Sequence, residues 1–127
     1  MIDLKKNSDI SPLVLAYLGD SVYEIYIREH LIDKGIRKVK ELQQNAIYYV
    51  SAKNQTNFLK NMIDNNILSE EEISIVNRAR NHSCNHKPKN TDIVTYKYST
   101  GFEALIGYLY LNNKDRLEEI MKIILGG

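Results

Sequence analysis

The sequence predicts an all-α fold, and three observations support this prediction. No segment alternates apolar and polar residues as a half-buried strand would. Apolar residues instead recur at helical spacing in several segments. Helix-start signals precede two of these segments, Ser11-Pro12 in one case and Ser69 with Glu72 in the other. Because a chain of 127 residues suits one hydrophobic core, we expect a single domain over residues 1–127.

The first predicted helix begins at Ser11-Pro12 and runs to about Lys34, since Gly35 suits the position after a helix end. A second helical region covers about residues 39–61. We expect it to break near Ser51, because a straight helix of that length is unusual in a small domain.

The capping box of Ser69 and Glu72 opens a further helix that ends near Arg80. Residues 81–95 are polar, contain a proline and lack apolar periodicity, so they predict a loop. Two last helices are expected within residues 99–111 and 115–125.

The formal net charge is +1, but the charge is unevenly spread. Between residues 78 and 98 a single acid, Asp92, faces five basic residues, which are Arg78, Arg80, Lys87, Lys89 and Lys97. Such a stretch marks either an anion-binding surface or a solvated loop, and charge alone does not separate the two.

One cysteine, Cys84, excludes a disulfide within the chain and indicates a reducing compartment. The first residues lack the apolar centre of a signal peptide, and no stretch approaches the ~20 apolar residues of a membrane span. We therefore expect a cytoplasmic protein without a membrane partner.

The most informative stretch is "LAYLGDSVYE", which places Gly19 and Asp20 in the apolar part of the first helix. A glycine within a helix costs about 0.5–1 kcal/mol relative to alanine, and an unpaired buried carboxylate costs more. Glu24 lies one helical turn beyond Asp20. A divalent cation would offset their repulsion, and oxygen ligands without His or Cys suit Mg²⁺. The alternative is that the pair lies at the solvent edge, with Glu24 facing Arg28.

A second carboxylate, Glu103, shares a helical stripe with Gly107 in "STGFEALIGYLYL". It fits a capping box with Thr100, which would be a purely structural role. The other interpretation is that two helices meet at Gly19 and Gly107 and bring Asp20 and Glu103 face to face in an acidic pocket.

Four stretches resemble the ribonuclease III family, and they occur in the family's order: "LGDSVYE", "YYVSAK", "NRARN" and "PKNTDIVTYKYSTGFEALIGYLYL". The closer match is the short bacterial branch, Mini-ribonuclease III, which consists of the nuclease domain alone. The resemblance implies an all-α ribonuclease III-type endonuclease domain that forms a symmetric homodimer. It also implies Mg²⁺-dependent cleavage of double-stranded RNA and, for the short branch, maturation of the 5′ and 3′ ends of the 23S ribosomal RNA precursor.

The resemblance assigns the catalytic and metal-binding roles to Asp20 and Glu103, with Glu24 as an additional candidate ligand. Two further acids of the full-length enzymes fall on Ala16 and Thr100, so a sparser metal site is implied. The candidate RNA contacts are Arg78, Arg80, Asn81, Lys87, Lys89 and Lys97.

A homodimer is also expected from the first helix, which carries apolar residues on more than one face and therefore needs cover on all sides. Two alternative functions remain open. The losses at Ala16 and Thr100 fit a double-stranded RNA-binding protein with impaired catalysis, and the helical fold alone would fit a protein-interaction adaptor.

Overall fold

A computed structural model describes residues 10–83 and 89–126, and within these ranges the protein is all-helical, without strands. The elements in chain order are α1 (Pro12–Asp33), α2 (Val39–Val50), α3 (Ala52–Asp64), α4 (Glu70–His82), α5 (Ile93–Asn112) and α6 (Lys114–Leu125). The predicted all-α fold is confirmed.

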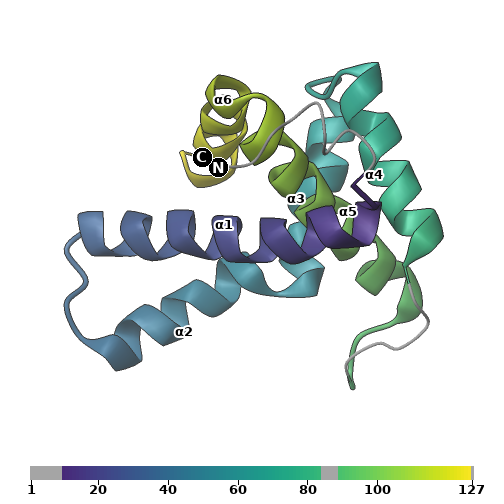
Figure 1. Cartoon of the computed structure of the whole chain (residues 1–127). Helices are drawn as coiled ribbons and strands as arrows, with labels where there is room; N and C mark the ends of the chain where they lie inside the picture. Colours follow the sequence, from purple (N-terminus) through teal and green to yellow (C-terminus); the bar gives the residue numbers. More distant parts are fainter. Residues whose placement is uncertain (1–9, 84–88, 127) are drawn as a thin grey trace.

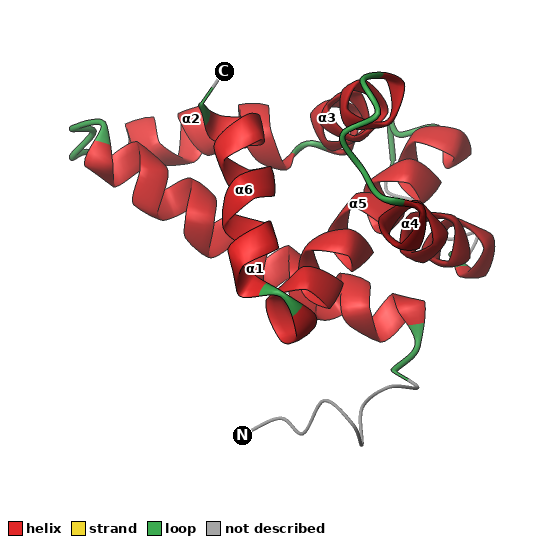
Figure 2. Ribbon diagram, turned by 90° about the horizontal axis from the view of Figure 1, so that it is seen from above, coloured by secondary structure: helices red, strands yellow, loops and turns green. Residues whose placement is uncertain are grey.

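Helix α5 lies at the centre and packs against α1, α3 and α4 (Figure 1). Figure 2 shows α3 and α4 grouped on one side of the molecule and α2 and α6 on the other. The largest buried side chains come from several helices and include Tyr23 and Phe102, whose rings meet edge to face at 4.9 Å between centroids. This contact joins α1 to α5 and thereby fixes the two helices that carry the candidate acids.

The C-terminal half of α1 and helix α2 form an arm that projects from the rest of the molecule (Figure 1). No residue of α2 is buried. A groove of about 450 Å³ between α1 and α2 is lined mainly by aliphatic side chains, including Leu31, Leu42 and Val50. Among the described helices, none is long and apolar enough to cross a membrane.

The predicted helix starts are largely correct. Ser11 caps α1, and Ser51 separates α2 from α3 while its hydroxyl accepts a hydrogen bond from Asn54 N at 3.3 Å. The capping box is present, with Glu72 N donating to Ser69 Oγ at 3.1 Å and Ser69 N donating to Glu72 Oε1 at 2.9 Å.

The predicted loop over residues 81–95 is too long at its C-terminal end. Asp92 caps α5, because its carboxylate accepts hydrogen bonds from Thr95 N at 2.9 Å and from the Thr95 hydroxyl at 2.8 Å. Helix α5 therefore begins at Ile93, about two turns before the predicted start at residue 99. At the other end of the loop, α4 continues to His82.

Candidate active site

Helices α1 and α5 cross with their backbones in direct contact at Gly19 and Gly107. A Cβ atom on Gly19 would lie 1.7 Å from the carbonyl oxygen of Glu103, and one on Gly107 would lie 2.0 Å from that of Leu15. Any larger residue at either position would therefore force the helices apart. The expectation that the two helices meet at these glycines is confirmed.

The crossing brings the side chains of Asp20 and Glu103 together, although they are far apart in the sequence. Burial of Glu103, together with a hydrogen bond to Asp20 and the charge of that carboxylate, raises the pKa of Glu103 to about 8. At neutral pH the Glu103 carboxyl is therefore mostly protonated and can donate a hydrogen bond to Asp20. Gln55 of α3 acts in the opposite direction, because its amide favours the ionised form of Glu103 and lowers the pKa of that carboxyl.

A pocket of about 270 Å³ opens over this pair. Its walls come from the N-terminal half of α1, the end of α4 and the first three turns of α5, and the lining residues are Leu13, Ala16, Tyr17, Asp20, Ser83, Tyr96, Thr100 and Glu103. Ala16 and Thr100, the two positions where the resemblance to the full-length enzymes would put acids, both line the pocket. A small methyl group and a hydroxyl group therefore occupy the places where that resemblance would put two acids.

The capping-box interpretation of Thr100 and Glu103 is wrong, because both residues lie in the interior of α5. The Thr100 hydroxyl instead donates to the carbonyl oxygen of Tyr96 at 3.0 Å and accepts from the hydroxyl of Ser83 at 3.4 Å. These bonds hold the end of α4 against α5 at the rim of the pocket.

Glu24 is separated from this pair. Its carboxylate accepts a hydrogen bond from the Arg28 guanidinium at 3.0 Å, and both side chains line the groove between α1 and α2. The solvent-edge ion pair that the sequence offered as an alternative is formed, so the structure does not bring Glu24 to the pocket as a third ligand.

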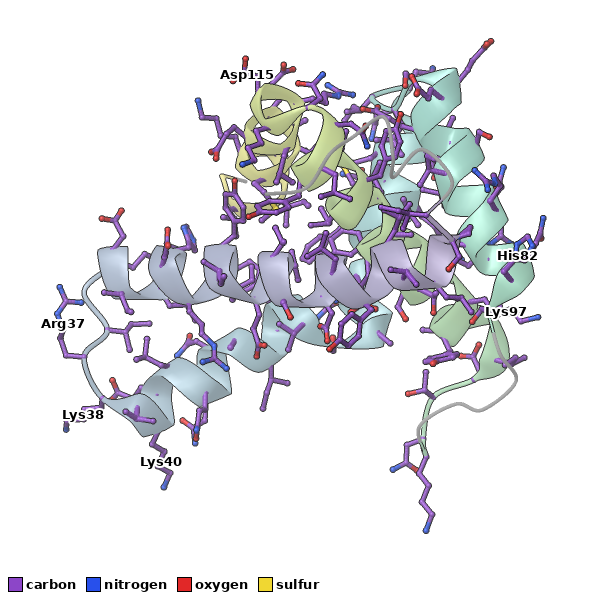
Figure 3. The ribbon with its side chains drawn as sticks, in the orientation of Figure 1. Arg37, Lys38, Lys40, His82, Lys97 and Asp115 are labelled. Carbon is purple, nitrogen blue, oxygen red and sulfur yellow. The ribbon has the colours of Figure 1, made fainter. Side chains whose placement is uncertain are left out.

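The basic residues near the pocket divide into two kinds. Arg80 ties α4 to α5, because its guanidinium lies 3.9 Å from the ring centroid of Tyr98 and donates to Asn77 at 3.3 Å. The other candidate RNA contacts that the structure describes are Arg78 and Asn81 on α4, Lys89 in the turn before α5, and Lys97 in the second turn of α5. The first three are exposed, and Lys97 is half-buried. Figure 3 shows Lys97 and His82 at this end of the molecule. Lys87 lies outside the described residues.

Sequence reasoning missed Gln55, which is only 3% exposed. It shares one face of α3 with Leu59 and Met62, both of which are buried. A glutamine on an otherwise apolar stripe was the available signal, because a buried amide needs a polar partner. Here that partner is Glu103.

The donor set available to a metal ion is small. Within the described parts of the chain, no group of three or more His, Cys, Asp and Glu side chains could hold an ion. Asp20 and Glu103 provide two carboxylates, and carboxylate oxygens suit a hard cation. Burial and the charge of Asp20 disfavour the ionised form of Glu103, and a cation bound at this position would offset both effects. The two residues therefore fit a divalent ion whose remaining ligands come from water or substrate.

Several known proteins are similar to this chain in sequence or in fold. The sequence model of the Ribonuclease III domain matches residues 13–114. The Mini-ribonuclease 3 of Streptococcus pneumoniae is 47% identical over 113 residues, which is 88% of each chain. That of Clostridium tetani is 46% identical over 125 residues, covering 97% of this chain and 80% of the relative. A crystal structure of a Fusobacterium nucleatum protein superposes with a TM-score of 0.83 at 33% identity and covers 94% of each chain.

Proposed function

The chain belongs to the ribonuclease III family of endoribonucleases, and from this premise we propose that it cleaves double-stranded RNA with Mg²⁺ at the Asp20–Glu103 pocket. One observation carries the proposal. Two carboxylates about eighty residues apart in the sequence meet at a crossing of two helices, where Gly19 and Gly107 permit backbone contact. We propose the 23S ribosomal RNA precursor as the natural substrate, because the chain resembles the short branch of the family. Cleavage would mature the 5′ and 3′ ends of this RNA.

In this proposal Asp20 and Glu103 hold the metal ion. When bound, Mg²⁺ supplies an acidified water and stabilises negative charge on the scissile phosphate. Gln55 would act as a positioning residue for Glu103, because its almost fully buried amide favours the ionised carboxylate that a metal ion needs. Ala16 leaves space on the α1 side of the pocket, where a phosphate can approach.

Recognition of the duplex would rely on phosphates and 2′-hydroxyls, since the deep major groove of A-form RNA hides the base edges. Arg78, Asn81, Lys89 and Lys97 are the described residues proposed for these contacts, together with Lys87. Arg80 has a positioning role, because its guanidinium lies over Tyr98.

We also infer a symmetric homodimer. Val14, Tyr17 and Ile25 lie on one outward stripe of α1 at helical spacing, and they are 54%, 82% and 57% exposed. Apolar side chains aligned in this way favour cover by another surface. A two-fold dimer would present two identical pockets to the two antiparallel strands of a duplex.

A second candidate function is duplex RNA binding without cleavage, and the uncharged Ala16 and Thr100 in the pocket favour it. One experiment separates the candidates: the purified protein is incubated with duplex and single-stranded RNA of the same sequence, with Mg²⁺ or with EDTA. We expect cleavage of the duplex in Mg²⁺ alone. Binding without cleavage in either condition would support the second candidate, and no RNA binding at low salt would support a protein-interaction adaptor.

A further inference from the structure

A second basic cluster lies far from the pocket, at the end of the arm. Four cations, Lys34, Arg37, Lys38 and Lys40, occur within seven residues where α1 turns into α2. We call residues 34–40 the arm tip. Figure 3 shows Arg37, Lys38 and Lys40 at one end of the molecule and Lys97 at the other. The ion pairs among the described residues involve only Arg28 and Arg116 as cations, so none of the four is paired with an acid there.

Two of the four cations have structural roles. Arg37 donates to the carbonyl oxygens of Ile32 and Ile36, and Lys34 occupies the C-cap of α1, where a cation is favourable. Gly35 has a φ of 99°, which allows the tight turn after the helix. The arm tip is therefore a built turn that holds its side chains in defined places.

Lys38 and Lys40 have no such role, and the fold would be better without their charges. Lys38 is the N-cap of α2 and makes no side-chain capping bond, and Lys40 follows in the first turn. A cation near a helix N-terminus is unfavourable by about 0.3–1 kcal/mol. Each other described helix has a capping side chain, from Ser11, Ser51, Ser69, Asp92 or Asn113. Two lysines placed at a cost to α2 indicate a function outside folding.

Helix α1 links the arm tip rigidly to the pocket, because the same helix carries Asp20 and ends at Asp33. Thirteen residues separate Asp20 from Asp33, so at 1.5 Å per residue the end of α1 lies about 20 Å from Asp20, and Lys38 and Lys40 follow that end at the start of α2. Phosphates along one DNA strand recur about every 3.4 Å of helix axis, so about 20 Å spans at least about six base pairs. An extended polyanion with regular charges therefore matches the separation of the two sites.

We propose that the arm tip binds the phosphate backbone of the RNA duplex at least about six base pairs from the cleavage site, through Lys38 and Lys40. The inference rests on the proposed function and adds a second contact region to it. Because α1 fixes the distance between the pocket and the arm tip, binding at both sites requires a minimum length of duplex on one side of the scissile bond.

The test uses the full chain with Lys38→Ser and Lys40→Gln combined. Serine supplies the missing N-cap, so the melting temperature should stay equal or rise. The matched control is Lys114→Gln with Lys122→Gln, which removes the same charge from α6. Binding is measured by fluorescence anisotropy over a salt series in EDTA, with duplexes that extend about 12 or about 3 base pairs beyond the cleavage site, a choice that brackets the six-pair spacing.

On the long duplex, the salt slope of the arm-tip variant should fall by about 1.5, as expected for two lost phosphate contacts, and its affinity should fall with it. On the short duplex the variant and the native chain should bind alike, and the α6 control should match the native chain on both. An unchanged salt slope on the long duplex overturns the proposal, as does an equal loss on both lengths. Failure of the native chain to bind any duplex would instead refute the proposed function.

Discussion

Gly19 of α1 and Gly107 of α5 face each other across a backbone contact, and each occupies space that a side chain on the other helix would need. The Cβ position of Gly19 is 2.8 Å from Gly107 N, and the Cβ position of Gly107 is 3.1 Å from Gly19 N. Because Asp20 follows Gly19 and Glu103 lies one turn before Gly107, the separation of the two carboxylates depends on this contact.

Gly19→Ala should therefore lower the free energy of unfolding substantially. Overpacking typically costs about 1–3 kcal/mol, and contact with rigid backbone places this site at the upper end or beyond. The gain in helix propensity, about 1 kcal/mol, would not offset it. Urea denaturation measures the change. Gly101→Ala is the control on α5, because its Cβ would come no closer than 3.0 Å to Val76 Cγ1 and 3.1 Å to the Val76 carbonyl oxygen, against 1.7 Å to the Glu103 carbonyl oxygen for Gly19→Ala. An equal effect of the two substitutions would contradict this role of the crossing.

The glycines show what the sequence could predict. Gly19 and Gly107 violate helix propensity within apolar stripes, and such violations indicate a close approach even before a structure is known. The capping signals of Ser11 and Ser69 likewise predicted the starts of α1 and α4, since they depend on neighbouring residues alone. The break near Ser51 was predicted from the length of the helical region, and Ser51 is the residue between α2 and α3.

Features that depend on distant contacts could not be predicted in this way. The start of α5 is an exception, because the Asp92 cap is a local signal, and it places Thr100 and Glu103 inside the helix rather than in a capping box. The role of Gln55 required knowledge of which helix covers α5. The ion pair of Glu24 with Arg28 was predictable as a local alternative, whereas its separation from the pocket depends on the position of α2.

Asp20→Asn and Glu103→Gln should each reduce cleavage of duplex RNA by about a hundredfold or more, the scale on which a single electrostatic contact matters in catalysis. Both changes keep the side-chain shape and remove charge. The metal-free Glu103→Gln variant should be about as stable as the native chain at pH 7, because the amide is neutral like the protonated Glu103 carboxyl and can also donate a hydrogen bond to Asp20. Single-turnover kinetics and thermal melts measure the two quantities. Cleavage by Glu103→Gln at the native rate would refute the assignment.

Mg²⁺ binding should release protons near neutral pH. The pKa of Glu103 is about 8 without metal, so at pH 7 the ion must displace a proton from a carboxyl that is mostly protonated. Because the ionised fraction rises with pH, apparent metal affinity should increase up to about pH 8 and then level off. Calorimetry in buffers of different ionisation enthalpy counts the protons. Glu103→Gln is the control and should release none, and proton-neutral binding by the native chain would contradict this scheme.

Glu72 should contribute to stability at neutral pH and lose that contribution in acid. Arg116 donates to both of its carboxylate oxygens, at 2.8 and 2.9 Å, and this pairing lowers the pKa of a side chain that is 5% exposed. A carboxylate with a lowered pKa stabilises the folded state above its unfolded pKa, and the effect disappears as the pH falls through the folded value. Glu72→Gln should therefore be less stable at pH 7, with the difference shrinking below about pH 4.5. Glu119→Gln, at an exposed ion pair with Arg116, should show little change in thermal melts at either pH.

The outward stripe of α1 should hold the dimer together. Val14 and Ile25 are both more than half exposed and lie outside the catalytic pocket, so replacing both by glutamate would place charge in a covered interface without disturbing the core. We expect Val14→Glu with Ile25→Glu to sediment as a monomer with native helical content, while the native chain sediments as a dimer. Ile123→Glu on α6, at a residue 39% exposed, is the control and should remain dimeric.

The monomeric variant should also lose coordinated cutting of the two strands, because each chain carries one Asp20–Glu103 pair and a duplex presents two strands. A native chain that sediments as a monomer and still cuts both strands in one encounter would refute the two-fold arrangement.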